Sequence, residues 1–353
     1  MEDKSSYGII AFFFAIMLSL FLFSNTVGLS KLLQLQISLP LNGYFILTSF
    51  SMALILTFFE AISSRGFDKF IVPLTSAIFL FIFFNKPDPE LLNGFLIGLL
   101  IAGVIAFSSY KVRFLTANGS VATFLLAGFI FGLGGLKWSV PMMAFFVLSS
   151  ILSKIRKKQN EKIEQYFEKS GVRDFMQVLA NGGIGGVLVV INQIFPNEIY
   201  FIVYIAVLAA VCADTWATEI GTMVKTNTYN ILNFKPVDQG VSGGISLIGT
   251  LGAFCGAFVI ALSGIFWIQP DLVQYLLIVI SAGLFGSFLD SILGATIQAQ
   301  NMCNVCSKIT ERDIHCGEKA EHFKGYKLIN NDMVNLFAGL SGGLIIIIVY
   351  GLL

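Results

Sequence analysis

Long apolar runs dominate this chain. A membrane-spanning helix needs about 20 mostly apolar residues, and eleven windows of the sequence approach or reach that length. Backbone groups inside a bilayer must be hydrogen-bonded within the segment itself, so runs of this kind fold as helices. The sequence therefore predicts an all-α fold, a polytopic membrane helix bundle with about 11 transmembrane helices. The predicted spans are 7–29, 43–62, 70–84, 91–110, 119–134, 136–153, 175–195, 199–222, 242–268, 273–298 and 334–353.

The composition excludes several other classes of protein. Of the 353 residues, 56% are hydrophobic and 12% are charged, whereas soluble domains carry roughly 25% charged residues. A net charge of +1 gives no basic face for nucleic acid. Five cysteines in a chain of this length do not form a disulfide framework. The few polar residues within the apolar spans should therefore indicate the function.

Lysine and arginine are distributed unevenly over the loops. When the loops are assigned alternately to the two sides of the membrane, 19 of the 22 basic residues fall on one side. Basic loops face the cytoplasm. We therefore expect a cytoplasmic N-terminus, an external C-terminus and cytoplasmic loops at 154–174, 223–241 and 299–333. The protein should reside in the cell (inner) membrane with its active site facing the cytoplasm.

Polar residues inside the spans are concentrated in the later part of the chain. Residues 1–110 hold four spans with few buried polar groups, and we interpret them as an accessory membrane segment. Residues 111–353 hold seven spans and nearly every intramembrane polar residue, which predicts the catalytic membrane domain.

Three acidic residues lie within the predicted spans of residues 111–353. Asp214 and Glu219 belong to the span 199–222, and Asp290 belongs to the span 273–298. At 1.5 Å per helical residue, Asp214 and Asp290 lie at similar depths from the cytoplasmic side. Intramembrane acids usually face a cavity, a cation or each other, so we predict that these three hold Mg²⁺. The alternative is a pair of interhelical hydrogen bonds without a ligand.

A polar stripe opens the span 175–195. Arg173, Gln177 and Asn181 follow a spacing of four residues and so share one helix face. Because a guanidinium binds phosphate in a bidentate manner, the stripe predicts a phosphate-binding surface. The alternative is an arginine that extends to the lipid headgroups.

The segment between the spans 199–222 and 242–268 is rich in glycine. Lys235 and Asp238 precede Ser242 and Gly243. A helix that begins with small residues offers free backbone N–H groups to phosphate. We therefore predict that Lys235 is catalytic and that Asp238, Ser242 and Gly243 bind the nucleotide. Glycines that merely pack membrane helices are the alternative.

The loop 299–333 contains three cysteines and both histidines of the chain. Cys303, Cys306 and Cys316 together with one histidine would complete a small structural zinc site, and we take His322 as the fourth ligand. A reduced cysteine cluster without metal is the alternative.

Several sequence blocks, taken together, resemble the integral membrane proteins of the domain-of-unknown-function family 92, which includes the phytyl-phosphate kinase of tocopherol synthesis. The resemblance covers roughly residues 111–353. It implies a membrane enzyme that acts on an isoprenoid phosphate. The blocks that carry it are LTANGSVATFLLAG (115–128), FFVLSS (145–150), VRDFMQVLANGG (172–183), ADTWATEIG (213–221), GVSGGISLIGTLGA (240–253), GSFLDSILGAT (286–296) and NNDMVNLFAG (330–339).

A more distant similarity is to the dolichol kinase, phytol kinase and CDP-diacylglycerol synthase group. Asp214 matches the acid of its membrane motif and Lys235 matches its lysine, while Asp238-Gln239-Gly240 stands where the group has Glu-Gly. The similarity implies CTP as nucleotide, Mg²⁺ and a lipid acceptor. Residues 58–74 also resemble the closing segment of the lipid-alcohol kinases through Glu60, Asp68 and Pro73, which is consistent with a degenerate repeat.

We therefore expect a membrane prenyl-phosphate kinase that transfers a phosphoryl group from a nucleotide, CTP by preference, to a polyprenyl or phytyl-type monophosphate. Its partners would be the bilayer, the prenyl phosphate and the nucleotide, and not nucleic acid. A lipid cytidylyltransferase that forms a CDP-lipid and a membrane transporter are the alternatives. A transporter is often built from inverted repeats, and the sequence contains no convincing pair.

Overall fold

The computed structural model describes residues 5–25, 43–63, 66–160, 172–268 and 271–352. Several basic residues used to predict the orientation lie outside the described residues, as does the centre of the predicted loop 154–174. These residues are Lys4, Lys31, Arg65, Lys162 and Lys169.

Helices form nearly the whole described structure, and each predicted span coincides with a helical stretch. Eight described helices are long and apolar enough to cross a membrane, which confirms an all-α polytopic membrane fold. Eleven crossings and a cytoplasmic N-terminus stay predictions. The helices are α1 (Ser6–Asn25), α3 (Gly43–Ile62), α4 (Asp68–Phe79) with a π-helical extension η1 (Leu80–Phe84), α5 (Pro89–Lys111), α6 (Ala117–Gln159), α7 (Phe175–Ile194), α8 (Glu198–Met223), α9 (Leu247–Gly264) with a 3-10 turn η3 (Ile265–Trp267), α10 (Leu272–Thr296) and α11 (Asn331–Leu352).

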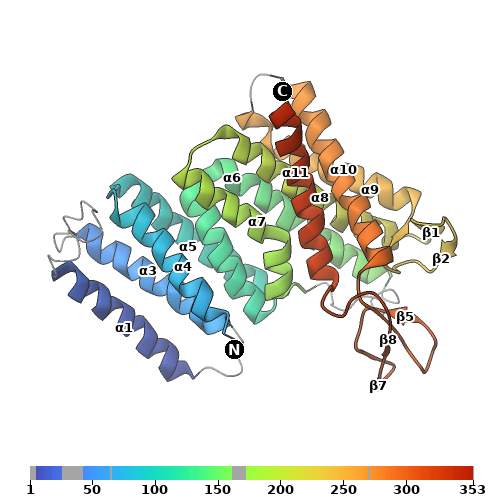
Figure 1. Cartoon of the computed structure of the whole chain (residues 1–353), viewed down its shortest axis with the longest axis horizontal. Helices are drawn as coiled ribbons and strands as arrows, with labels where there is room; N and C mark the ends of the chain where they lie inside the picture. The colour runs from blue at the N-terminus through green and yellow to red at the C-terminus, as the bar shows by residue number, and fades with distance from the viewer. Residues whose placement is uncertain (1–4, 26–42, 64–65, 161–171, 269–270, 353) are drawn as a thin grey trace.

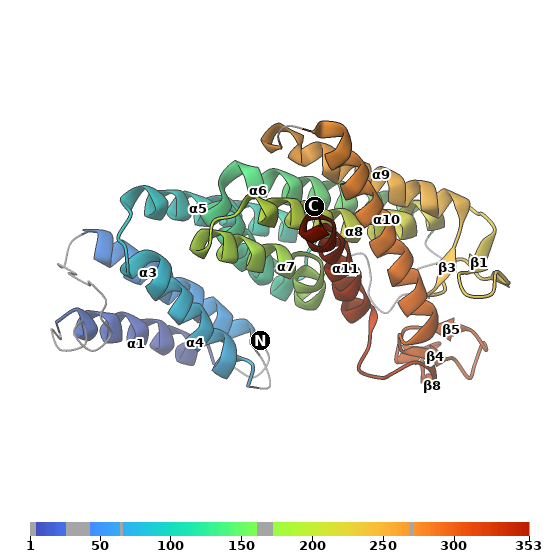
Figure 2. The same cartoon turned by 45° about the horizontal axis from the view of Figure 1, so that its top comes forward.

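The helices α1, α3 and α4 lie at one end of the molecule, and α6 and α7 lie between them and the β-strands (Figures 1 and 2). Their core is aromatic. The rings of Phe79, Phe83 and Phe95 pack with centroids 5.0–5.4 Å apart, and Phe129 of α6 joins them. Such rings bury a large apolar area, and the edge-to-face contacts of Phe79 and Phe95 with Phe129 tie this end of the molecule to α6.

Helix α6 contains two of the predicted spans in one element. It is interrupted at Gly135, whose φ of 58° no ordinary helical residue adopts. Its first half packs closely on α5, since a Cβ added to Gly98 would lie 2.5 Å from the backbone nitrogen of Gly132. Helix α5 is therefore packed against the later part of the chain, although most of it precedes the predicted domain boundary at residue 110.

Helix α8 occupies the centre of the later part of the chain. Every residue from Val203 to Ala213 is buried, as expected for a helix that is apolar on all faces. Small residues allow its neighbours to approach closely. A Cβ added to Gly256 of α9 would lie 2.8 Å from the carbonyl oxygen of Cys212. One added to Gly342 of α11 would lie 2.8 Å from that of Ala206.

Two loops that were predicted to be cytoplasmic contain short antiparallel sheets. Strands β1 (Thr228–Asn230), β2 (Pro236–Val237) and β3 (Gly244–Ile245) form one sheet between α8 and α9. Strands β4 (Gln300–Met302), β5 (Ile309–Thr310) and β8 (Glu321–Lys324) form a second, and β6 (Ile314–His315) pairs with β7 (Glu318–Lys319). Both loops lie at the end of the bundle away from α1, α3 and α4 (Figure 2).

The glycine-rich segment differs from its predicted structure. The predicted span 242–268 begins at Leu247, with Ser246 as its N-cap. Gly243 has a φ of 83°, which prevents an earlier helical start. Ser242 and Gly243 therefore belong to the loop before the helix and not to its first turn.

Candidate active site

A polar cavity of about 220 Å³ lies where α6 to α11 meet the two sheet-containing loops. All the residues that line it lie at or after Ser153. Among the predicted site residues, those that line the cavity are Arg173, Gln177, Asn181, Asp214, Glu219, Ser242, Gly243 and Asp290. Those that do not are Lys235, Asp238, Cys303, Cys306, Cys316 and His322.

Helices α8 and α10 bring two of the predicted acids together. Gly286 of α10 packs directly on Ala210 of α8. One helical turn further on each helix, Asp290 and Asp214 lie on the same faces, and their carboxyl groups are close enough to interact electrostatically. Small residues on the preceding turn are thus what allows the acids to meet.

Glu311 is a third acid of this group, although no sequence motif marks it. It lines the same cavity, and its charge acts on both aspartates. Its Oε1 accepts hydrogen bonds from Ser242 Oγ at 2.6 Å and from Gln298 Nε2 at 2.7 Å. Three carboxyl groups in one cavity repel one another unless a cation or protons neutralise them.

Asp214, Asp290 and Glu311, here called the acid group, fit a hard divalent cation. Oδ2 of Asp290 is buried and has no hydrogen-bond partner in the described structure. A buried carboxylate oxygen left in this state is unfavourable, and Mg²⁺ prefers carboxylate oxygen ligands. Asp214, Asp290 and Glu311 are therefore the residues that could hold the ion.

Glu219 lines the cavity but does not join the other acids, contrary to the predicted trio. Five residues separate it from Asp214, which places it about 140° further around the helix. Its carboxylate faces α6, where it accepts hydrogen bonds from Ser153 Oγ at 2.6 Å and from Arg156 Nε at 2.5 Å. Glu219 and Arg156 thus form a buried ion pair, and Glu219 is not free to serve the acid group.

Arg173 is buried beside α6 and does not extend to the lipid headgroups. Its backbone is bonded to Phe114 and Thr116. Its guanidinium donates to Ser150 Oγ and lies over the rings of Phe145 and Phe146. Arg173 and Arg156 both line the polar cavity, and Arg156 is paired there with Glu219.

A second, smaller cavity of about 50 Å³ lies between α5, α6 and α7. Its other lining residues are almost all apolar, and they include Ile105 of α5 and Met142 of α6. Arg173, Gln177 and Asn181 line both cavities. The predicted polar stripe is therefore the boundary between a polar space and an apolar one.

Two members of that stripe differ in how they are held. Gln177 forms a capping box with Asp174, in which each side chain accepts a hydrogen bond from the other residue's backbone. Oδ1 of Asn181 is buried and has no hydrogen-bond partner in the described structure. It is thus the member of the stripe with an acceptor available to a ligand.

Lys235 and Asp238 are exposed and lie outside the cavity, contrary to the predicted roles. The turn from Asn230 to Lys235, closed by the Asn230 N–H and the Lys235 carbonyl, holds the lysine at the surface. Gln239 is the residue of this segment that reaches inward. Its Nε2 donates to the carbonyls of Gly221 and Val224 and so caps α8.

The first turn of α11 also contributes to the cavity through Asn331, Asp332 and Asn335. Asn331 and Asn335 are four residues apart and face the same way. This spacing was visible in the sequence, but the segment was assigned to a loop and a span boundary. Arg156 was missed because its charged surroundings are typical of a solvated helix, whereas its side chain is only 3% exposed.

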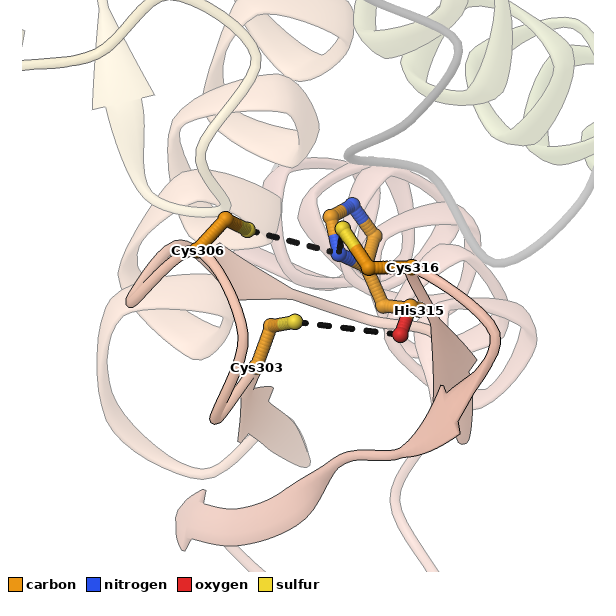
Figure 3. Close-up of side chains that lie close together, drawn as sticks. All are labelled: Cys303, Cys306, His315 and Cys316. Atoms are coloured by element: carbon orange, nitrogen blue, oxygen red, sulfur yellow. Dashed lines mark hydrogen bonds between the residues drawn. The ribbon is translucent and has the colours of Figure 1, made fainter.

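Three cysteines and one histidine converge in the loop 299–333 (Figure 3). The ligand atoms of Cys303, Cys306, His315 and Cys316 all lie within 4.8 Å of one another. Backbone hydrogen bonding from Cys306 lowers the pKa of the Cys303 thiol to about 6, which favours the thiolate at neutral pH. The structure places His315 in this cluster and not the predicted fourth ligand His322, which lies on β8 with its Nε2 3.0 Å from the Gly325 carbonyl.

The protein is a helical membrane bundle with buried acids and arginines around one cavity. It therefore belongs to the class of polytopic membrane proteins with a polar site within the membrane. The chain belongs to the family described as integral membrane protein DUF92, whose model matches residues 100–343. The resemblance inferred from the sequence is thereby confirmed. The chain is an integral membrane protein in contact with the lipid bilayer.

Similar proteins occur in plants and archaea. Protein PGR of Arabidopsis thaliana is 32% identical over 261 residues, which cover 67% of this chain and 89% of that protein. An uncharacterized membrane protein of Methanocaldococcus jannaschii is 27% identical over 263 residues, covering 74% and 96% of the two chains. Protein VTE6, chloroplastic, of Arabidopsis thaliana is 24% identical over 246 residues, covering 68% and 67%. No solved structure matches the chain.

Proposed function

We propose that the protein is a prenyl-phosphate kinase that transfers the terminal phosphoryl group of a nucleotide, CTP by preference, to a prenyl monophosphate. The observation that carries the proposal is the junction of the two cavities at Arg173, Gln177 and Asn181. A lipid phosphate needs a polar space for its head and an apolar one for its chain. The family resemblance to phytyl-phosphate kinase and the relative VTE6 support the same substrate class.

The acceptor would bind with its phosphate at the junction. Arg173 would donate to the phosphate, because a guanidinium fits the geometry of that group. The open acceptor of Asn181 would meet a nucleotide or lipid hydroxyl or a bound water. The prenyl chain would enter the apolar cavity between α5, α6 and α7.

The acids would hold Mg²⁺ on the opposite side of the polar cavity. Asp214, Asp290 and Glu311 would be its ligands, for which the unpartnered Oδ2 of Asp290 is the supporting observation. When bound, the ion neutralises charge on the nucleotide phosphates. Arg156 and the glycine-rich segment around Gly243 line the same cavity, and we propose that they contact the nucleotide phosphates.

The reaction needs little covalent chemistry from the protein. An ionised oxygen of the prenyl phosphate forms a bond to the terminal phosphorus of the nucleotide. The bond from that phosphorus to the bridging oxygen breaks, and the nucleoside diphosphate leaves with the electron pair. Because the attacking oxygen is already ionised, no strong general base is required, and catalysis consists of positioning and charge neutralisation.

The test uses purified full-length protein in lipid discs with Mg²⁺, a panel of prenyl phosphates, and nucleotides labelled either in the terminal phosphate or in the base. The proposal predicts that the terminal-phosphate label alone appears on the lipid. Base label on the lipid would indicate cytidylyl transfer and contradict the proposal. A second outcome would also contradict the proposal. In it, no lipid becomes labelled, although weaker nucleotide binding by the Asp290→Asn variant than by the wild type shows that the nucleotide binds at the acids.

A further inference from the structure

We propose that Cys303, Cys306, His315 and Cys316 bind one Zn²⁺ ion, and that this ion holds Glu311 in the acid group of the cavity. The role given to Glu311 rests on the proposed function, whereas the zinc site does not. The two parts are therefore tested by different measurements.

Two spacings between histidine nitrogen and cysteine sulfur match tetrahedral zinc. With Zn–S near 2.3 Å and Zn–N near 2.0 Å, a tetrahedral site separates sulfur from nitrogen by about 3.5 Å. His315 Nδ1 lies 3.6 Å from Cys306 Sγ and 3.3 Å from Cys316 Sγ. A set of three cysteines and one histidine is typical of a closed structural zinc site.

The backbone around these residues is shaped to aim their side chains inward. The Ser307 N–H donates to the Cys303 carbonyl at 2.8 Å, and the Cys303 N–H donates to the Lys308 carbonyl at 3.0 Å. Ser307 and Cys316 have φ values of 56° and 51°. Non-glycine residues adopt this left-handed region only where the surrounding structure holds them there. Here one such residue, Ser307, directly follows Cys306, and the other is Cys316 itself.

The loop has almost no hydrophobic core of its own. Between residues 299 and 329, the buried hydrophobic residues are Cys303 and Ala320. Its strands are only two to four residues long. A segment of this size that buries so little apolar surface is usually stabilised by disulfides or a metal. The three cysteines of this loop are free thiols, and a metal is the remaining stabiliser.

Glu311 lies in the middle of the segment that zinc would close. It follows β5, whose pairing with β4 is closed by the turn at Cys303 and Cys306. On its other side, Asn301 Nδ2 donates to the carbonyl of Arg312 at 3.0 Å, and β6 begins three residues after Glu311 with His315 as its last residue. Glu311 is thus bounded on both sides by proposed zinc ligands.

From this position Glu311 reaches out of the loop to the membrane bundle. Its hydrogen bonds go to Ser242, on the glycine-rich segment before α9, and to Gln298, after α10. The zinc loop would therefore supply one acid of the cavity and tie two other loops together through it. Loss of zinc should therefore free Glu311 and loosen the two loops that it ties together.

The first measurement is the metal content of the purified full-length protein by elemental analysis. We expect about one zinc per chain in the wild type and in Glu311→Gln. We expect less than a fifth of that in Cys306→Ser and Cys316→Ser. His322→Ala is the matched control, because this histidine lies in the same loop outside the cluster, and it should keep its zinc. A wild type without zinc, or a cysteine variant that retains it, overturns the zinc site.

The second measurement is hydrogen exchange on the wild-type protein before and after zinc is removed by a chelator and then restored. This design avoids variants that fail to fold. We expect at least tenfold faster amide exchange in residues 300–316 and in the segment around Ser242, reversed when zinc is added back. Faster exchange in 300–316 with no change around Ser242 overturns the positioning of Glu311. If both responses occur but no lipid is phosphorylated, the inference stands and the proposed function fails.

Discussion

The two parts of this molecule are both helical and apolar, yet they are packed in different ways. Around α3, α4 and α5 the core consists of interlocking phenylalanine rings, such as Phe79, Phe83 and Phe95. Around the second half of α8 the closest contacts are made by glycine and alanine, such as Gly286 on Ala210, whereas Phe201 and Tyr204 of its first half pack on Trp138. Bulky rings keep helix backbones apart and fill the space between them. Small residues bring backbones together, and polar side chains on the adjoining turns then meet.

This difference explains why the cavity lies in the later part of the chain. Asp214 and Asp290 stand one turn beyond a small-residue contact, and the atoms Asp290 Oδ2, Asn181 Oδ1 and Asn335 Oδ1 are buried there without hydrogen-bond partners in the described structure. The aromatic part contributes no residue to the polar cavity. We interpret the aromatic part as support, with α5 adding Ile105 to the wall of the apolar cavity, and the small-residue part as the polar site.

The largest effect should follow from Asp290→Asn, which removes a charge from the acid group without changing its shape. We expect kcat to fall by about 100- to 1,000-fold, the usual loss when a group that stabilises developing charge is removed. Label transfer to a prenyl phosphate measures it. A thermal unfolding temperature close to that of the wild type would show that folding is retained, and unchanged turnover would contradict the role of the acid group.

Next in size should be the effect of Glu219→Gln on stability. This change leaves Arg156 as a buried charge without its carboxylate, and removal of one partner of a buried pair costs about 3 kcal/mol or more. Thermal unfolding in detergent should register the loss. Replacement of both residues, Arg156→Met with Glu219→Leu, should recover most of it, because the uncompensated charge is gone. If the double variant is no more stable than the single one, the ion pair is not the cause.

A smaller effect is expected from Arg173→Lys, which keeps the charge but removes the planar guanidinium. We expect KM for the prenyl phosphate to rise about 10-fold or more, because a charged hydrogen bond contributes about 1.5–3 kcal/mol. Lys235→Ala provides the matched comparison. Its side chain is exposed outside the cavity, so its KM should change less than that of the arginine variant. A larger effect at Lys235 would restore the role predicted from the sequence.

The smallest effect should be that of Glu60→Gln in α3. Glu60 lines neither cavity, and a change of about 0.5 kcal/mol, the usual limit for a substitution outside a site, is about twofold. We therefore expect turnover within that range. Abolished turnover in a folded protein that still binds nucleotide would place α3 in the active site and remove the contrast between the two parts.

The sequence was informative where chemistry and local spacing coincide. Asp214 and Asp290 were identifiable because acids within apolar spans are rare, and the helical spacing of Arg173, Gln177 and Asn181 placed them on one face. The ion pair between Arg156 and Glu219 was not identifiable, because 63 residues separate its members and no local pattern relates them. Glu311 and His315 depend on the register of short strands, which a sequence of loop residues does not specify.

The most direct test of the central claim is a structure determined with a prenyl phosphate, Mg²⁺ and a non-hydrolysable nucleotide. We expect metal density on Asp214 and Asp290, nucleotide phosphates in the polar cavity, and the lipid phosphate at Arg173 with its chain between α5, α6 and α7. Nucleotide or lipid bound elsewhere, with the acid group and the junction of the two cavities free of ligand, would contradict it.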